Sequence, residues 1–202
     1  CSSDLLQNGS SALVPGSNRA VTFGGKASIT VAPGESAWSD AVALPFVREP
    51  ADLAGRKLAV SFHVAGESGP MTWHAKALQT SYLSAPRSGA RGHEESEAAF
   101  PFSTTSWYFL DALDMMMPTD AYTVVAFGDS ITDGTASTLN GDDRWPDVLA
   151  RRLHAAQPNR VAVVNAGIGG NQVVGPAVYP PPKPFPGGPA ALLRLEIGRA
   201  HV

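Results

Sequence analysis

The sequence predicts an α/β fold for residues 119–196, preceded by a β-rich domain of the β-sandwich or jelly-roll kind over residues 6–118. Turn residues recur about every ten positions in the first part, which is the spacing of short strands in a sandwich. In the second part, two nearly continuous apolar runs flank one amphipathic helix within about 45 residues. This order predicts a βαβ unit, in which the two strands are parallel and the crossover is right-handed.

The two ends of the chain share a signal at the DNA level. Residues 1–5 can be encoded by a segment whose complementary strand encodes Ile197-Gly198-Arg199-Ala200, and this segment resembles a common sequencing adapter. We therefore expect residues 1–5 and 197–202 to be adapter-derived tails, and residues 6–196 to be an internal fragment of a longer protein. On this interpretation Cys1 does not indicate a lipid-bearing terminus, and His201 is not a candidate base.

Length and composition exclude several classes of partner. The 202 residues are 44% hydrophobic and 16% charged, which is typical of a globular chain with a sizeable core. The formal net charge of -3, without a cluster of lysine and arginine, does not indicate a nucleic-acid-binding surface. No apolar run reaches the roughly 20 residues that a membrane-spanning helix needs. We therefore expect neither a nucleic-acid partner nor a membrane span.

Within the β-rich part, apolar and polar residues alternate around a Gly24-Gly25 turn and again over residues 58–64. His63 and His74 fall within strand-like runs, so we expect a structural role for both. The cluster Trp107-Tyr108-Phe109 has two interpretations, a sugar-binding platform or part of a β core. We favour the core, because aromatic side chains bury large apolar areas.

The α/β part begins with an apolar run, YTVVAF, that predicts a strand buried on both faces of a parallel sheet. Asp142 and Asp143 suit the N-cap of the following helix, which tolerates Pro146 in its first turn. The run RVAVVNA predicts the second buried strand. A Pro-rich loop over residues 179–189 follows, and the run AALLRLE predicts the start of another helix.

Candidate chemistry lies where the two predicted strands end. Ser130 follows the first strand, and a glycine-rich loop from Asn165 to Asn171 follows the second. The carboxyl ends of parallel strands form the edge where α/β sheets bind ligands. A serine hydroxyl beside free backbone N–H groups is the minimum arrangement for acyl transfer. The glycines could instead cradle a phosphate, but a dinucleotide fingerprint would follow the first strand and open a helix directly.

The histidines do not predict a metal site. No pair of them has the spacing of metal ligands on a helix. We expect His154 to lie in solvent on its helix, away from the apolar stripe, and His93 to lie in a polar loop. Neither is therefore a candidate base for Ser130.

Two motifs carry a resemblance to a known family. FGDSITDG, from Phe127 to Gly134, looks like the first motif of the GDSL or SGNH hydrolases, and NAGIGGN, from Asn165 to Asn171, looks like the second. The β-rich part resembles the N-terminal domain of a secreted bacterial branch of that family. The resemblance implies the N-terminal half of a three-layer α/β/α hydrolase domain. It also implies hydrolysis of carbohydrate or lipid esters through an acyl-enzyme, without metal or cofactor, in a secreted or periplasmic protein.

The family's residue roles can be transferred to the matching positions. Ser130 would be the nucleophile, and its own N–H and that of Gly170 would bind the oxyanion. Four further residues would support the two motifs: Gly128, Asp129, Asn165 and Asn171. We expect Asp129 to shape the turn, and the Pro-rich loop to wall one side of an acyl pocket.

The family's two later motifs, Gly-X-Asn-Asp and Asp-X-X-His, do not occur in these residues. A serine hydroxyl without a base is a weak nucleophile. We therefore expect this chain to be essentially inactive and its full-length parent to be an esterase. The alternative is a non-catalytic carbohydrate-binding or adhesion protein on a hydrolase-like scaffold.

Overall fold

The computed structural model describes residues 2–5, 10–48, 52, 55–175 and 187–199. These residues form two compact units. The first unit comprises Cys1–Thr72 and Ser81–Thr104, and the second comprises Trp73–Thr80 and Thr105–Val202. The sequence placed a single boundary near residue 118, whereas here a short upstream segment joins the second unit. It does so through hydrogen bonds such as the one from the Thr80 backbone N–H to Asn140 Oδ1, at 2.8 Å.

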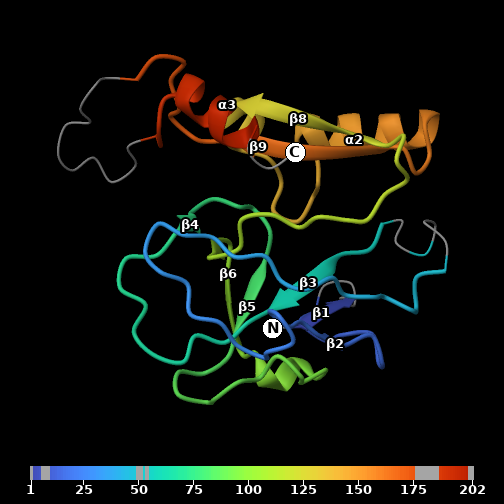
Figure 1. The fold of residues 1–202 in the computed structure, drawn as a ribbon, viewed down its shortest axis with the longest axis vertical. Coiled ribbons are helices and arrows are strands. Elements are labelled where there is room, and N and C mark those ends of the chain that lie inside the picture. Colours follow the sequence, from blue (N-terminus) through green and yellow to red (C-terminus); the bar gives the residue numbers. More distant parts are fainter. Residues whose placement is uncertain (1, 6–9, 49–51, 53–54, 176–186, 200–202) are drawn as a thin grey trace. The chain divides into compact units, whose positions relative to one another are not determined.

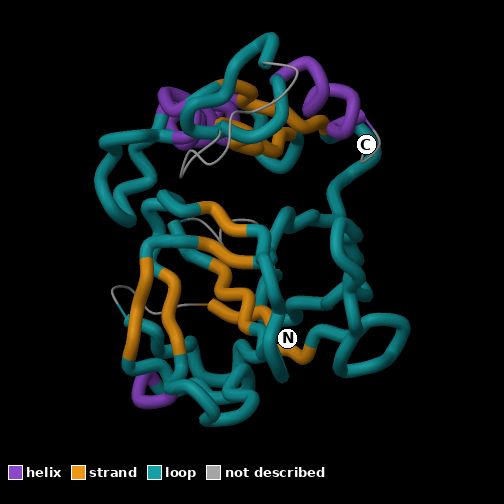
Figure 2. The backbone as a smooth tube through the Cα atoms, turned by 90° about the vertical axis from the view of Figure 1, so that its left-hand side faces the viewer, coloured by secondary structure: helices purple, strands orange, loops and turns teal. Residues whose placement is uncertain are grey.

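The first unit contains short antiparallel strands connected by long loops (Figures 1 and 2). One sheet has the order β2-β1-β3 and a second pairs β5 with β6. The bounds are β1 (Ser2–Leu5), β2 (Arg19–Ala20), β3 (Leu58–Ser61), β5 (Ser81–Leu83) and β6 (Phe102–Thr104), with a 3₁₀ helix η2 (Glu97–Ala99) before β6. Residues 2–5, expected to be part of a foreign tail, pair with both β2 and β3.

The expected β-sandwich is not confirmed in this unit. The Gly24-Gly25 turn is present, with Phe23 and Lys26 bridged across it, but the alternating run that follows forms no strand. Ile29 and Val31 are 48% and 47% exposed. Alternation predicts a strand only where a facing layer covers its apolar side, and no described element covers these two residues.

The second unit is built on two parallel strands, β8 (Tyr122–Gly128) and β9 (Val161–Gly167), which pair along their whole length. Helix α2 (Trp145–Ala156) connects them and packs against β9. A one-turn helix α1 (Ser130–Asp133) follows β8, and α3 (Ala191–Arg199) lies further along the chain (Figure 1). The predicted βαβ unit is therefore confirmed.

Two details of that prediction are wrong. Ala126 and Val161 are buried, but Val125 and Val164, which face each other in the register, are 55% and 47% exposed. Successive side chains point to opposite faces, so one face of the strand pair lacks a cover among the described residues. In addition, the N-cap of α2 is Arg144 rather than Asp142 or Asp143. None of the helices in the described ranges is long and apolar enough to cross a membrane.

A two-stranded ribbon completes the second unit. It pairs β4 (Trp73–His74) with β7 (Trp107–Tyr108) in antiparallel register. The prediction that the aromatic cluster lies in a β core is wrong, because Trp107 and Phe109 are 42% and 43% exposed. The ribbon has only two strands, and no third strand is paired with it in the described part of the chain.

Candidate active site

Ser130 is the first residue of α1, directly beyond the end of β8. Asp129 is the N-cap of this helix, and its Oδ1 accepts a hydrogen bond of 2.9 Å from the Ile131 backbone N–H. The turn closes at Gly134, whose φ of 98° is in the left-handed region that glycine adopts without strain. The N–H of Gly134 donates to the carbonyl of Ser130 at 3.0 Å. This sharp strand-to-helix turn holds the serine at the carboxyl edge of the sheet.

The loop that follows β9 lies against α1. A Cβ atom added at Gly169 would lie 4.0 Å from the Ser130 Cβ and 3.6 Å from Asp133 Oδ2. A Cβ added at Gly167 would come within 2.2 Å of the Asp133 backbone nitrogen. Gly170 has a φ of 80°, again a conformation that favours glycine. The structure therefore brings the glycine loop next to Ser130. The two segments can approach this closely because glycine has no side chain.

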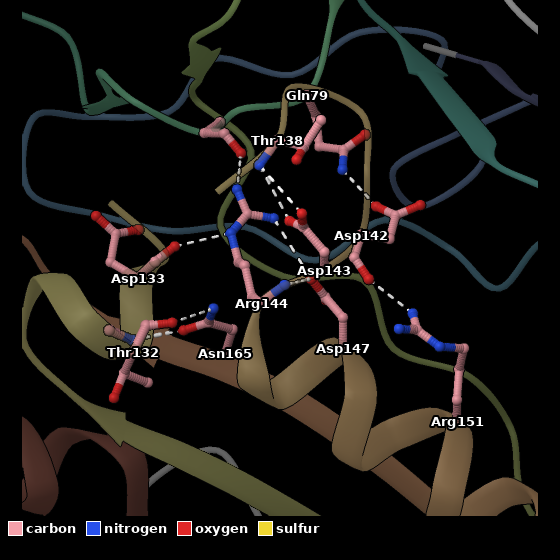
Figure 3. A network of polar contacts seen from close by, with 12 residues as sticks. Gln79, Thr132, Asp133, Thr138, Asp142, Asp143, Arg144, Asp147, Arg151 and Asn165 are labelled. Carbon is pink, nitrogen blue, oxygen red and sulfur yellow. Dashed lines mark hydrogen bonds and ion pairs between the residues drawn. The ribbon is translucent and has the colours of Figure 1, made fainter. Parts of the chain in front are cut away.

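Asn165 joins this loop to α1. Its Nδ2 donates to the Thr132 carbonyl at 2.7 Å, and its Oδ1 accepts from the Gly167 N–H at 2.9 Å (Figure 3). Asn171, at the far end of the loop, donates from Nδ2 to the carbonyls of Gly187 and Pro189, each at 2.7 Å. Both asparagines are thus held by backbone groups, and both fix the path of the loop.

Arg194 on α3 links the ends of the two strands. Its Nη1 donates to the Ala166 carbonyl at 3.0 Å, and its Nη2 donates to the Gly128 carbonyl at 3.3 Å and to Asn171 Oδ1 at 2.9 Å. The guanidinium carbon also lies 4.2 Å from the centre of the Phe127 ring. Burial lowers the pKa of the Arg194 guanidinium below its ordinary value. The sequence analysis missed this residue, and its signal was one arginine within the apolar run of residues 191–195.

Arg144 is hydrogen-bonded to the last residue of α1 (Figure 3). Its side chain is 10% exposed, and it donates from Nε to the Asp133 carbonyl at 2.8 Å and from Nη2 to the Ala77 carbonyl. Its own backbone N–H donates to Asp147 Oδ2 at 3.0 Å, forming part of a capping box. The turn that contains Ser130, the start of α2 and the upstream segment are therefore joined through one arginine side chain.

Asp143 and Asp142 hold the loop before α2 instead of capping the helix. The Thr138 backbone N–H donates to Asp143 Oδ1 at 3.1 Å. The Thr138 side chain and this backbone bond hold the pKa of the Asp143 carboxyl below its ordinary value. Gln79 Nε2 donates to Asp142 Oδ1 at 2.5 Å, which fastens the upstream segment to the same loop.

His74 reaches the site, although the sequence predicted only a structural role for it. Its Nε2 lies 2.7 Å from Oδ1 of Asp133, the last residue of α1. Asp133 is 7% exposed, so this carboxylate is nearly removed from solvent. His154 lies elsewhere, with Nε2 2.7 Å from the Val161 carbonyl, and the side chain of His93 is 75% exposed.

A half-buried serine at the carboxyl end of a parallel strand, against a glycine loop from the neighbouring strand, is an arrangement typical of hydrolases on an α/β scaffold. Residues 126–196 match the model of the GDSL-like lipase/acylhydrolase family. This segment contains both motifs, so the resemblance to the GDSL/SGNH hydrolases is confirmed over these residues, and the match supports a general esterase or hydrolase function. A comparison of the chain with curated proteins finds no match. Most of the Pro-rich loop expected to wall an acyl pocket lies outside the described residues.

Proposed function

We propose that Ser130 is the nucleophile of a serine esterase that hydrolyses carboxylic esters through an acyl-enzyme. The observation that carries the proposal is the contact between the serine turn and the glycine loop, where the Gly169 Cβ position lies 4.0 Å from the Ser130 Cβ. A serine hydroxyl beside a glycine-rich backbone loop at one edge of the sheet supports this assignment. The family match over the same residues supports it.

The reaction has two steps. In the first, Ser130 Oγ bonds to the ester carbonyl carbon, its proton passes to a base, and the carbon–oxygen bond to the alcohol breaks as the alcohol leaves with a proton. In the second, water adds to the acyl carbon as the base takes one of its protons, the bond to Ser130 Oγ breaks as that proton passes to Oγ, and the carboxylic acid leaves. In both steps negative charge develops on the carbonyl oxygen, and the N–H groups of Ser130 and Gly170 would stabilise it.

The motif residues serve this geometry without transferring protons. The carboxylate of Asp129 accepts a hydrogen bond from the Ile131 N–H. Asn165 ties Gly167 and Thr132 together. Each is therefore a positioning residue, which keeps the nucleophile turn and the oxyanion loop in register.

The base is expected in the Asp-X-X-His motif of a longer parent, so we propose that the 202-residue chain is essentially inactive. We also propose secretion or a periplasmic location for that parent, and a carbohydrate or lipid ester as its substrate. The rival proposal is a non-catalytic binding protein. Sequence that continues Glu196 in frame decides between them, since the enzyme requires both later motifs.

Hydrolysis of p-nitrophenyl acetate tests the proposal on the full-length parent and on the 202-residue chain. The parent should be active, and Ser130→Ala should lower its kcat about a thousandfold or more. Ser137→Ala is the matched control, a nearby serine that should leave kcat unchanged. Parent activity that survives Ser130→Ala would overturn the assignment of the nucleophile, and Ser130-dependent turnover by the short chain would overturn the predicted inactivity.

A further inference from the structure

The upstream segment, Trp73–Thr80, is fastened to the rest of the second unit at several points. The Thr80 N–H donates to Asn140 Oδ1 at 2.8 Å, and Asn140 Nδ2 donates to Thr80 Oγ1, also at 2.8 Å. Nearer the start of the segment, the Ala77 carbonyl accepts a hydrogen bond from a side chain at the start of α2. His74 contacts the last residue of α1. The His74 contact therefore joins the segment directly to the turn that contains Ser130.

The contact between His74 and Asp133 is short and largely removed from solvent. His74 Nε2 lies 2.7 Å from Asp133 Oδ1, and the Asp133 side chain is 9% exposed. Nε2 is itself buried and makes no hydrogen bond of regular geometry among the described residues, so its polar contact there is with this carboxylate. In the same ranges no second side chain pairs with the Asp133 carboxylate. Loss of the imidazole would therefore leave a nearly buried carboxylate without a partner, which is unfavourable.

The β4–β7 ribbon holds the imidazole from a second side. His74 is paired with Trp107 in the register of the ribbon, and the two ring centroids lie 6.2 Å apart with an angle of 75° between the ring planes. This edge-on arrangement is one of the preferred geometries of aromatic pairs. The strand pairing fixes the backbone of His74, and the indole restricts the rotation of its ring. His74 therefore presents Nε2 to Asp133 from a fixed position.

Asp133 and Ser130 are the two ends of one helical turn. The Asp133 N–H donates to the Asp129 carbonyl at 2.9 Å, and the N–H groups of Gly134 and Thr135 donate to the Ser130 carbonyl at 3.0 and 2.9 Å. Because α1 is a single turn, a shift of its last residue also shifts its first. A contact that fixes Asp133 therefore also fixes the place of the serine.

We propose that His74 is a positioning residue of the esterase: through Asp133 it holds α1, and with it Ser130, against the glycine loop. The catalytic part of this inference rests on the proposed function. In this role His74 takes no proton from Ser130, and its contribution is geometric. The upstream segment is then part of the catalytic unit, although it precedes β8 in the chain and the family match begins only at residue 126.

Hydrogen exchange on the 202-residue chain tests the hold on α1 without any need for activity. His74→Ala should accelerate exchange of the N–H groups of Asp133, Gly134 and Thr135 about tenfold or more. His74→Gln, whose side-chain amide can donate to the same carboxylate, should keep their exchange within about threefold of the wild type. The N–H groups inside α2 are the internal reference and should change less than about twofold.

His154→Ala is the matched control. It removes an imidazole whose Nε2 also has a polar contact of 2.7 Å in the second unit, but with the Val161 carbonyl. Exchange in α1 should stay within about twofold of the wild type in this variant. Unchanged exchange in α1 of His74→Ala overturns the inference. Equal acceleration in α1 and α2 also overturns it, because His74 would then support the whole fold rather than the serine turn.

Kinetics of p-nitrophenyl acetate hydrolysis by the full-length parent test the consequence for catalysis. His74→Ala should lower kcat about tenfold to a hundredfold and leave KM within about twofold, because the substrate still binds while the serine is misplaced. His74→Gln should recover most of this loss, and His154→Ala should leave kcat unchanged. Adding Asp133→Ala to His74→Ala should cost little further activity, since the two residues act through one contact.

The two measurements separate this inference from the proposed function. If exchange in α1 accelerates while kcat of His74→Ala stays at the wild-type value, or if KM alone rises, the positioning role in catalysis is overturned. A parent that hydrolyses no ester, or whose activity survives Ser130→Ala, overturns the proposed function. Accelerated exchange confined to α1 would in that case still support the hold of His74 on the turn.

Discussion

Replacing Gly167 with alanine tests whether the close contact between β9 and α1 holds the site together. The new Cβ would lie 2.2 Å from the Asp133 nitrogen and 2.7 Å from both the Asp133 Cα and the Thr132 carbonyl carbon, whereas real Cβ contacts do not fall below 3.0 Å. All three neighbours are backbone atoms, so no side-chain rotation relieves the overlap. The loop and α1 must therefore separate by roughly 1 Å.

The expected cost follows from that separation. Overpacking of this kind destabilises a folded protein by about 1–3 kcal/mol. For a chain of this length each kcal/mol lowers Tm by about 2–4 °C, so Gly167→Ala should lower Tm by about 2–12 °C. In the longer esterase that we propose, a misplacement of about 1 Å between Ser130 and the glycine loop should lower kcat about a hundredfold.

Gly169→Ala is the matched control for this prediction. Its Cβ would meet Asp133 Oδ2 at 3.6 Å and the Ser130 Cβ at 4.0 Å, which are ordinary contacts. Its Tm should stay within about 2 °C of the wild type. Thermal unfolding followed by circular dichroism measures both variants. If Gly167→Ala melts no lower than Gly169→Ala, β9 and α1 are not in the contact described here, and the reasoning fails.

Three further outcomes are expected from the polar network. Arg144→Met leaves the Ala77 carbonyl without its donor and should lower the free energy of unfolding by about 1–3 kcal/mol, measured by urea denaturation, with Arg144→Lys falling between it and the wild type. The lowered pKa of Asp143 stabilises the fold above that group's unfolded pKa and loses this contribution as pH falls through its folded pKa; Asp143→Asn, which disturbs the bonds from Thr138, should therefore flatten the fall of Tm below about pH 4. Arg194→Lys cannot bond both strand ends at once and should lower kcat in the parent with little change in KM, so a rise in KM alone would contradict the idea that Arg194 holds the two strand ends in place.

Local signals were sufficient to predict the βαβ unit and the loops at the carboxyl ends of its two strands. The run from Tyr122 to Phe127 is apolar and β-rich over the length of one strand, and the helix that follows has a single apolar stripe. Both signals depend on neighbours within a few residues. The glycine-rich loop after the second strand could also be predicted from the sequence. In the structure Gly167 is needed because the backbone of α1 comes too close for a side chain, and Gly170 because its φ is positive.

The same local signals were misleading where burial depends on a distant layer. Alternation around Gly24-Gly25 predicted strands of a sandwich, yet Ile29 and Val31 are half exposed and lie in loops. Trp107 is of a residue type that is common in protein cores, yet it lies on a two-stranded ribbon and is 42% exposed. The residue type fixes how much apolar area a side chain can bury. Whether that area is buried depends on which other elements the fold packs against it.

By itself the sequence determined the strand–helix–strand order, Ser130 at the end of the first strand and the glycine loop at the end of the second, because each follows from residues adjacent in the chain. Only the tertiary structure decided that Arg144, Arg194 and His74 converge on that place. These residues belong to elements that are separated by long stretches of chain. A single hydrogen bond or ion pair between such elements produces no periodic pattern of residues from which it could be predicted.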